Sequence, residues 1–510
     1  MPKEVQINGV AFKELPEETQ KQWIKNTLPP GDTKILNDDQ VLLCLYVCLG
    51  KNICLLGPPG VGKTAALNRA QYLMHILYPE TKFDRTATTG MASTHLDNGK
   101  TLFDLLKTGT DSCLSYLPQF REKLMSPRVS KIIEELNSLH IDEASMLSEQ
   151  AFNSLESAAR VIRKNRKFMG GIQIILSGDI FQMPVVDGKV GAGHDRFKKI
   201  KLLSILENLP LSFEVVMLTQ NIRSEGDIKH QAIIKALIQQ DPSVRKRAIE
   251  LLHDTCYETT LSIEDALRLS METGKMILTP INESRELYNR VLGDILRKTN
   301  PSGPIEIGDA KPLHSWDTLP SWAQIDLINT KGLVQEEKSI IDQHRFESNL
   351  SLYPGEPVML RKNTKEYKNG EKCVFTSLSP DSSYITVRRY SDGAVLNITK
   401  SDITSEFIHN IGFEAFPLIK DAAMSIHMSQ GSTLDNGVIL DPYSLFNAPR
   451  LMYVAISRAR TLGKITLTEK IDIEKMVDAA AQKDIDRIWS LDYMANYPTI
   501  TLEELNAAFS

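Results

Sequence analysis

A glycine-rich stretch that follows an apolar run and opens a helix-prone segment carries the residue types that bind a nucleotide. In such loops the backbone N–H groups and the start of the next helix hold phosphates. We expect Lys63 to reach the β- and γ-phosphates of ATP and the Thr64 hydroxyl to take one position on Mg²⁺. The alternative is a tight Gly/Pro turn. The residues expected to bind the nucleotide are Gly57, Pro58, Pro59, Gly60, Val61, Gly62, Lys63 and Thr64.

A second apolar run ends in two adjacent carboxylates, Asp142 and Glu143. We expect Asp142 to hold Mg²⁺ directly or through a water, and Glu143 to orient and deprotonate the attacking water. A carboxylate in that place favours hydrolysis over transfer to a second substrate, although the pair alone would also fit a solvated surface. The next run ends in a turn with Gln182, whose amide is expected to sense the γ-phosphate; on its own it would be an ordinary solvated glutamine.

These side chains need a scaffold in which several strands end at one place. Short apolar runs alternate with helical patterns and predict an α/β fold with parallel sheets, whose ligands lie at the carboxyl ends of the strands. A run of alternating polar and apolar residues at 383–388, followed by a Ser-Asp-Gly turn, predicts a small antiparallel insertion. The expected parallel strands are residues 52–56, 136–141, 172–176, 275–278 and 437–440.

The chain of 510 residues exceeds a single hydrophobic core and predicts several domains. We expect a first parallel-sheet domain over residues 36–205 and a second one split between 206–290 and 411–470. The antiparallel insertion is expected over 291–410. Residues 1–35 form an N-terminal extension, and residues 471–510 form a helical C-terminal extension that docks on the core or binds a partner.

Composition indicates an ordinary soluble globular protein, with 42% hydrophobic and 24% charged residues. A net charge of −5 argues against a protein that coats nucleic acid by charge alone. No membrane span or signal peptide is evident, which predicts an intracellular protein: cytoplasmic in a bacterium or phage, nuclear or mitochondrial in a eukaryote. The six cysteines are scattered, so we expect neither disulfides nor a structural metal, with Cys44 and Cys48 as core thiols.

The ordered set of motifs resembles the helicases of superfamily one, B branch, and most closely the petite-integration-frequency and RecD-like group. The resemblance runs from about residue 36 to 467 and rests on more than any single motif. Besides the segments above, its motifs are LNDDQ ending at Gln40, TATTGMA from Thr86, GKT ending at Thr101, LTQNIR ending at Arg223, YPGEPVMLRKN from Tyr353, SIHMSQGST from Ser425 and YVAISR ending at Arg458.

This resemblance implies two RecA-like domains and an ATP-dependent helicase that moves 5′ to 3′ on single-stranded DNA, with tailed or forked duplexes as substrates. It implies work in DNA replication, recombination or repair, with proteins of those processes reached through the terminal extensions. Gln40 would read adenine, Gly431 would lie at the nucleotide, and Arg223 and Arg458 would reach the γ-phosphate. The DNA-backbone contacts would be Thr88, Thr89, Thr101, His427 and Thr433.

Alternatives remain at several of these positions. Each arginine alone would more often be a surface or salt-bridge residue, and His427 fits a satisfied buried histidine about as well as a DNA contact. The resemblance also implies a small wedge within residues 103–130 and a Src-homology-three-like barrel in the insertion, with 358–360 as one strand. The wedge tip would come from Leu114, Tyr116 and Phe120, although a packed local core is the more common role for such residues.

Two positions depart from the family pattern. Met428 stands where the family usually has lysine, and Phe103 where it commonly has histidine. Losing the lysine removes a possible phosphate cation, so DNA binding would be weaker or supported elsewhere. The alternative function is an ATP-driven DNA-binding switch or loader that does not unwind. A purely structural subunit is less consistent with an intact ATP site. A GTP-specific switch is disfavoured because the sequence has no Asn-Lys-x-Asp motif for reading the guanine base.

Overall fold

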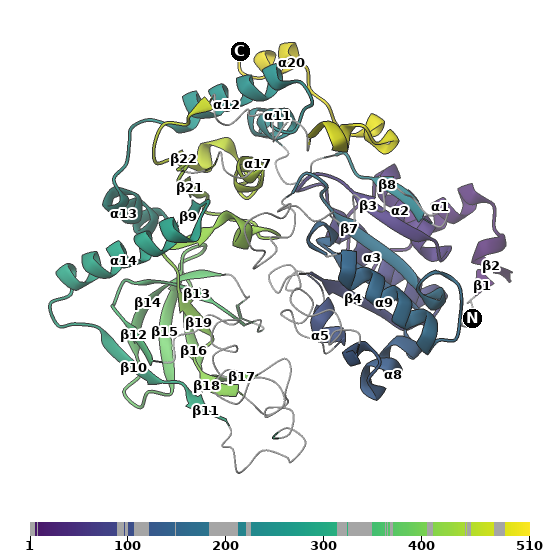
Figure 1. Cartoon of the computed structure of the whole chain (residues 1–510), viewed down its shortest axis with the longest axis horizontal. Helices are drawn as coiled ribbons and strands as arrows, with labels where there is room; N and C mark the ends of the chain where they lie inside the picture. Colours follow the sequence, from purple (N-terminus) through teal and green to yellow (C-terminus); the bar gives the residue numbers. More distant parts are fainter. Residues whose placement is uncertain are drawn as a thin grey trace. The chain divides into compact units, whose positions relative to one another are not determined.

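The computed structural model of the chain divides into two compact units (Figure 1). The first contains residues 1–251, 452–457 and 473–510, and the second contains residues 252–451 and 458–472. The structure describes residues 6–7, 9–88, 96, 100–106, 122–147, 149–182, 213–220, 226–313, 324, 349–362, 364, 366–367, 371–404, 412–443, 445, 450–473 and 485–510.

A six-stranded parallel sheet forms the centre of the first unit, in the order β5-β4-β6-β7-β3-β8. Its central strands are continuous apolar runs, as expected for strands covered on both faces. This confirms the predicted α/β class and the three strands expected before residue 205; the first has the expected ends, and the ends of the other two are shifted by one or two residues. The strands are β3 (Asn52–Leu56), β4 (Phe83–Ala87), β5 (Lys100–Thr101), β6 (Ser138–Asp142), β7 (Gln173–Gly178) and β8 (Phe213–Met217).

The position of β8 corrects one predicted boundary. Residues 206–290 were assigned to the second domain, but β8 pairs with β3 along its whole length. The first unit therefore continues to residue 251. The helices of this part are α1 (Glu17–Asn26), α2 (Asp38–Cys48), α3 (Lys63–Leu77), α5 (Leu102–Leu106), α8 (Pro127–Glu135), α9 (Glu149–Ile162), α11 (Ile228–Ala236) and α12 (Pro242–Cys256), which crosses into the second unit.

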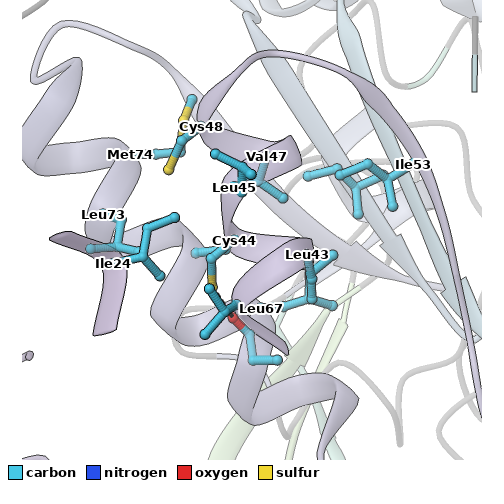
Figure 2. Packing of buried hydrophobic residues seen from close by; sticks show 14 of the residues in the cluster. Ile24, Leu43, Cys44, Leu45, Val47, Cys48, Ile53, Leu67, Leu73 and Met74 are labelled. Atoms are coloured by element: carbon cyan, nitrogen blue, oxygen red, sulfur yellow. Dashed lines mark hydrogen bonds between the residues drawn. The ribbon is translucent and has the colours of Figure 1, made fainter. Parts of the chain in front are cut away.

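Buried side chains of α1, α2, α3 and β3 form the core beside this sheet (Figure 2). Cys44 and Cys48 are fully buried there, which confirms them as core thiols, and burial raises the pKa of Cys44 to about 12. Phe12 and Ile24 belong to the same cluster, so the described part of residues 1–35 is integral to the first unit. The remaining short elements are β1 (Gln6–Ile7), β2 (Val10–Ala11), η1 (Phe12–Glu14), η2 (Ala144–Met146) and η3 (Phe168–Gly171).

The C-terminal extension packs on the first unit through aromatic side chains. The Phe181 ring lies 5.1 Å from that of Tyr497 and 5.9 Å from that of Trp489, between ring centroids. The Trp489 indole N–H donates to the Ile238 carbonyl at 2.8 Å. The described residues of this extension are helical in part and belong to the first unit. Its elements are a helix over 485–489, η8 (Asp492–Asn496) and α20 (Leu502–Ala507).

The second unit holds a parallel sheet in the order β20-β9-β21-β22, which confirms the strands predicted near 275–278 and 437–440. Leu292, Ile295 and Leu296 pack with Ile277 and Ile439 in its core. The elements are α13 (Ile263–Thr273), β9 (Met276–Thr279), α14 (Asn282–Thr299), β20 (Ala423–Ser425), η5 (Ile426–Ser429), β21 (Val438–Leu440), α17 (Leu451–Ile456), which ends in the first unit, η7 (Leu462–Lys464) and β22 (Ile465–Leu467).

The segment expected to form the insertion contains a five-stranded antiparallel sheet in the order β16-β15-β14-β13-β19 (Figure 1). Both of its predicted limits are corrected. Residues 291–299 complete α14 and its core, while β18 and β19 extend the insertion to residue 420. The strands are β10 (Ile305–Asp309), β11 (Lys311–Pro312), β12 (Asn349–Leu352), β13 (Pro357–Leu360), β14 (Lys372–Leu378), β15 (Tyr384–Arg389), β16 (Val395–Thr399), β17 (Ser401–Thr404), β18 (Gly412–Ala415) and β19 (Leu418–Lys420).

Among the helices that the structure describes, none combines the length and the apolar character needed to cross a membrane.

Candidate nucleotide and nucleic-acid sites

The glycine-rich loop connects β3 to α3, as the sequence predicts. Gly62 caps α3 in the left-handed conformation, with φ 80° and ψ 24°, which only glycine adopts without strain. A Cβ on Gly57 would lie 2.6 Å from the Leu218 carbonyl oxygen, so β8 also requires glycine there. Val61 is buried in the core cluster and anchors the loop. The loop therefore ends at the start of α3, where the first N–H groups of a helix have no acceptor within the helix and favour an anion.

Lys63 is the first residue of α3 and folds back onto its own loop. Its ammonium group donates to the carbonyl oxygens of Gly57 at 2.9 Å and Pro58 at 3.1 Å. These contacts hold the cation within the concavity formed by residues 57–62. Thr64, the next residue, is half-buried.

Asp142 ends β6, and its Oδ1 atom accepts two hydrogen bonds, from the Ser177 hydroxyl at 2.6 Å and from the Glu143 amide at 3.0 Å. The Ser177 oxygen also lies 2.7 Å from His140 Nε2. Because an ionised carboxylate only accepts, Ser177 donates to Asp142 and must accept from the His140 Nε2–H group. Burial lowers the pKa of His140 to about 3, so this imidazole is neutral. The chain of contacts fixes one carboxylate oxygen of Asp142.

Sequence reasoning did not identify Ser177 and His140. The available signal was their polarity: His140 lies between Leu139 and Ile141, and Ser177 follows the apolar run 174–176, both at fully buried positions. The register between β6 and β7 brings them together, since Ile141 pairs with Leu176. Such a pairing follows from the sheet and not from spacing in the chain.

Glu143 adopts a left-handed backbone conformation, with φ 51° and ψ 42°. For a residue with a Cβ this conformation costs about 1–2 kcal/mol. Neighbours hold it in place: the Glu143 carbonyl accepts from the Thr88 hydroxyl at 2.9 Å and from the Met146 amide at 3.0 Å. Strain maintained by surrounding contacts is a feature of functional positions. The left-handed conformation turns the Glu143 side chain away from the direction it would take if β6 continued as an extended strand.

The predicted DNA contacts of the first unit have other partners in this arrangement. The single hydroxyl proton of Thr88 is used on Glu143, so Thr88 links the end of β4 to the candidate base. Thr101 precedes α5, and its hydroxyl oxygen accepts from the Asp104 amide at 3.0 Å. Thr89 lies outside the described residues, as do the predicted wedge residues Leu114, Tyr116 and Phe120.

Gln182 follows β7 in a tightly held turn. Asp179 accepts from the Phe181 amide at 2.9 Å and from the Tyr453 hydroxyl at 2.6 Å. The Gln182 side chain is 3% exposed, and its amide oxygen has no hydrogen-bond partner among the residues that the structure describes. A buried acceptor without a partner is uncommon in native proteins and calls for a ligand or water. This placement is consistent with the predicted sensing role.

Gln40 occupies the third position of α2 in a capping box with Asn37. Its backbone N–H donates to the Asn37 side-chain oxygen at 2.9 Å, and its own side-chain oxygen accepts from the Asn37 backbone N–H at 3.2 Å. The Asn37 Nδ2 group donates in turn to Gln220 at 3.2 Å. Gln40 is therefore buried and fixed at the start of α2, and its predicted contact with adenine stays a prediction.

In the second unit, the segment after β20 contains several buried polar groups without partners. His427 Nε2 and both amide atoms of Gln430 have none among the described residues. Burial lowers the pKa of His427, so its ring is neutral at pH 7 and offers one donor. Gly431 has φ 79° and Thr433 is half-buried. Gln430 is a candidate ligand-binding residue that the sequence prediction omitted.

Arg458 is 2% exposed and belongs to the second unit. Its Nη1 group donates to the carbonyl oxygens of Ser432 at 3.1 Å and Ser429 at 3.4 Å. Arg458 thus holds the segment that carries His427 and Gly431. The other predicted arginine, Arg223, lies outside the described residues.

We expect Arg458→Ala to lower DNA-stimulated ATP turnover by about a thousandfold, because an arginine that neutralises the transferred phosphoryl contributes at least that much. Arg460→Ala is the matched control, since Arg460 is half-exposed and pairs with Asp435. The rate of ATP turnover is measured per mole of folded protein, and the affinity for single-stranded DNA is measured as well. A small loss of turnover together with a large loss of thermal stability would make Arg458 a structural donor only.

The donor set of the first unit suits Mg²⁺. This ion prefers oxygen ligands, keeps several waters, and is usually bound by one or two protein groups together with substrate phosphates. Thr64 would contribute a hydroxyl, and Asp142 would contribute a carboxylate that two hydrogen bonds orient at one oxygen. These residues fit the ion, and substrate phosphates would complete its coordination.

Comparison with known proteins places this arrangement in a broader context. Residues 35–240 match the family model of the PIF1-like helicases. The chain is 26% identical over 488 residues to the uncharacterised protein 030L of Invertebrate iridescent virus 6, covering 85% of this chain and 90% of that one. It is 24% identical over 496 residues to the ATP-dependent DNA helicase Pif1 of Psychrobacter sp., covering 85% and 68%.

A solved structure agrees with this relationship at the level of the fold. The crystal structure of Pif1 helicase from Candida albicans superposes with a TM-score of 0.66 at 20% identity, covering 90% of this chain and 100% of that one. The parallel sheets described above are therefore those of the RecA-like P-loop fold.

Proposed function

Because residues 35–240 form a PIF1-like helicase domain, we propose that this protein is an ATP-dependent DNA helicase that translocates on single-stranded DNA. One observation carries the proposal most directly. The strands β6, β7 and β3 are parallel neighbours, so Asp142, Gln182 and the loop before Lys63 follow the same edge of one sheet. That edge combines a phosphate cradle, a metal-binding carboxylate and a base, the parts that ATP hydrolysis requires.

Within this proposal each group has a distinct task. Lys63 and the N–H groups of the loop bind the β- and γ-phosphates, and Thr64 and Asp142 hold Mg²⁺. The ion, when bound, neutralises charge on the phosphate oxygens. Glu143 accepts a proton from the attacking water, while Gln182 responds to the γ-phosphate. Arg458 and Arg223 stabilise the charge that develops on the transferred phosphoryl.

The proposed substrates are single-stranded DNA and tailed or forked duplexes, with 5′ to 3′ movement. Thr88, Thr89, Thr101, His427 and Thr433 are candidate backbone contacts, which position a strand without reading its sequence. Changes in the grip of each RecA-like domain with nucleotide state would move the strand. We propose that the antiparallel insertion is the Src-homology-three-like barrel that the resemblance implies. Proteins of replication, recombination or repair are candidate partners.

The alternative, an ATP-driven switch or loader, shares the ATP site but not strand separation. The first experiment therefore asks whether ATP turnover depends on DNA. We expect the purified protein to hydrolyse ATP slowly alone and faster with a single-stranded oligonucleotide, and to require Mg²⁺. Turnover that single-stranded DNA leaves unchanged would contradict a DNA-driven motor in either form.

A further inference from the structure

The start of α14 carries an arginine with few partners. Arg285 lies in the first turn of this helix, and its Nη1 group is 3.6 Å from the Met428 sulfur. A thioether is a weak, uncharged acceptor. The carboxylate of Glu286 lies 3.8 Å from Nη2 and is 65% exposed, so this pair is screened by water. The guanidinium therefore has unused donor capacity.

The Arg285 Nε atom is buried, and it has no hydrogen-bond partner within the part of the chain that the structure describes. The same holds for His427 Nε2, next to Met428, and for the amide of Gln430, which is 2% exposed. These groups come from α14 and from the segment after β20. Their strands, β9 and β20, are parallel neighbours, so both segments begin at the carboxyl edge of the sheet. Two of these atoms, Arg285 Nε and Gln430 Nε2, are donors, and buried donors without a partner call for an acceptor.

We propose that Arg285 binds a phosphate of the nucleic-acid strand and supplies the positive charge that Met428 lacks. The inference rests on the proposed function, since the ligand is the backbone of single-stranded DNA. A phosphate offers several anionic oxygens, and a guanidinium donates to two of them at once. The Arg285 side chain is 22% exposed and its Nη1 group contacts the Met428 sulfur, so the guanidinium is held beside position 428. This contact adds affinity without sequence preference.

The test measures affinity for a thymidine oligonucleotide at several salt concentrations. Losing one phosphate contact should reduce the slope of log K against log salt by about 0.7, which corresponds to about fivefold weaker binding at 0.1 M salt. We expect this change for Arg285→Gln and not for Arg285→Lys, which keeps the charge. Arg297→Gln is the matched control, because Arg297 lies on the same helix, is 72% exposed and pairs with Asp294.

The contact with Met428 provides a charge-relocation variant. In Arg285→Gln with Met428→Lys the cation moves to the adjacent position, and we expect the slope to return to that of the unchanged protein. A folded Arg285→Gln protein with unchanged slope and affinity would overturn the proposal. The proposal would also be overturned if Arg285→Gln lost no more affinity than Arg297→Gln does. It would equally be overturned if the affinity loss of Arg285→Gln followed from lower thermal stability and Met428→Lys did not restore the affinity. Failure of the unchanged protein to bind the oligonucleotide would instead contradict the proposed function.

Discussion

Replacing Lys63 with alanine is expected to abolish ATP turnover and leave the first unit folded. The ammonium group is held by two loop carbonyls, and we expect it to turn from them to the nucleotide phosphates. Removing it takes away the cation that stabilises charge on the transferred phosphoryl. The loop itself is shaped by glycines and by buried Val61, which the substitution leaves in place. The measurement is the steady-state ATPase rate with saturating single-stranded DNA.

Lys82→Ala is a suitable control, because Lys82 is a half-exposed lysine of the same unit that pairs with Glu135. It should retain full turnover. If folded Lys63→Ala protein hydrolysed ATP as fast as the control, the loop would not be the nucleotide site and the whole account of the first unit would be wrong.

Glu143→Gln is expected to keep nucleotide binding and lose turnover by about 10²–10⁴-fold, the contribution of a positioned general base. Glutamine has nearly the same shape, and the contacts that hold the strained backbone come from main-chain atoms of Glu143. The phosphate cradle and Asp142 are unchanged, so the ATP affinity should be similar. Nucleotide affinity and single-turnover hydrolysis are measured on the same preparation.

The exposed Glu134 supplies the control Glu134→Gln, which should behave as the unchanged protein. Loss of nucleotide binding in Glu143→Gln would identify Glu143 as a structural or metal-binding residue. Unchanged hydrolysis would require another base.

The strands at the centre of each sheet could be predicted because buried parallel strands are continuous apolar runs with sharp ends. The boundary between the first and the second unit, expected near residue 205, could not be predicted. Residues 213–217 form another short apolar strand, and nothing local to them specifies pairing with β3 at the edge of the first sheet. Similarly, α14 runs past residue 290 because its last turns pack on β9 and β21, a contact between distant segments.

The candidate site shows the same division. Lys63, Asp142 and Glu143 were predictable because each lies in a short contiguous motif whose chemistry depends on its neighbours in sequence. Ser177, His140 and Arg285 act through contacts made across strands or between a helix and a distant loop. The Met428 departure indicated that a cation was missing. It could not show that α14 places Arg285 beside that position.

Strand displacement tests the central claim most directly. Duplexes with a 5′ or a 3′ single-stranded tail are mixed with the protein, ATP and Mg²⁺, with Lys63→Ala as the inactive control. We predict ATP-dependent release of the strand from the 5′-tailed duplex, little release from the 3′-tailed one, and none with Lys63→Ala. DNA-stimulated ATP turnover with no release from either duplex would contradict a helicase and favour the non-unwinding switch.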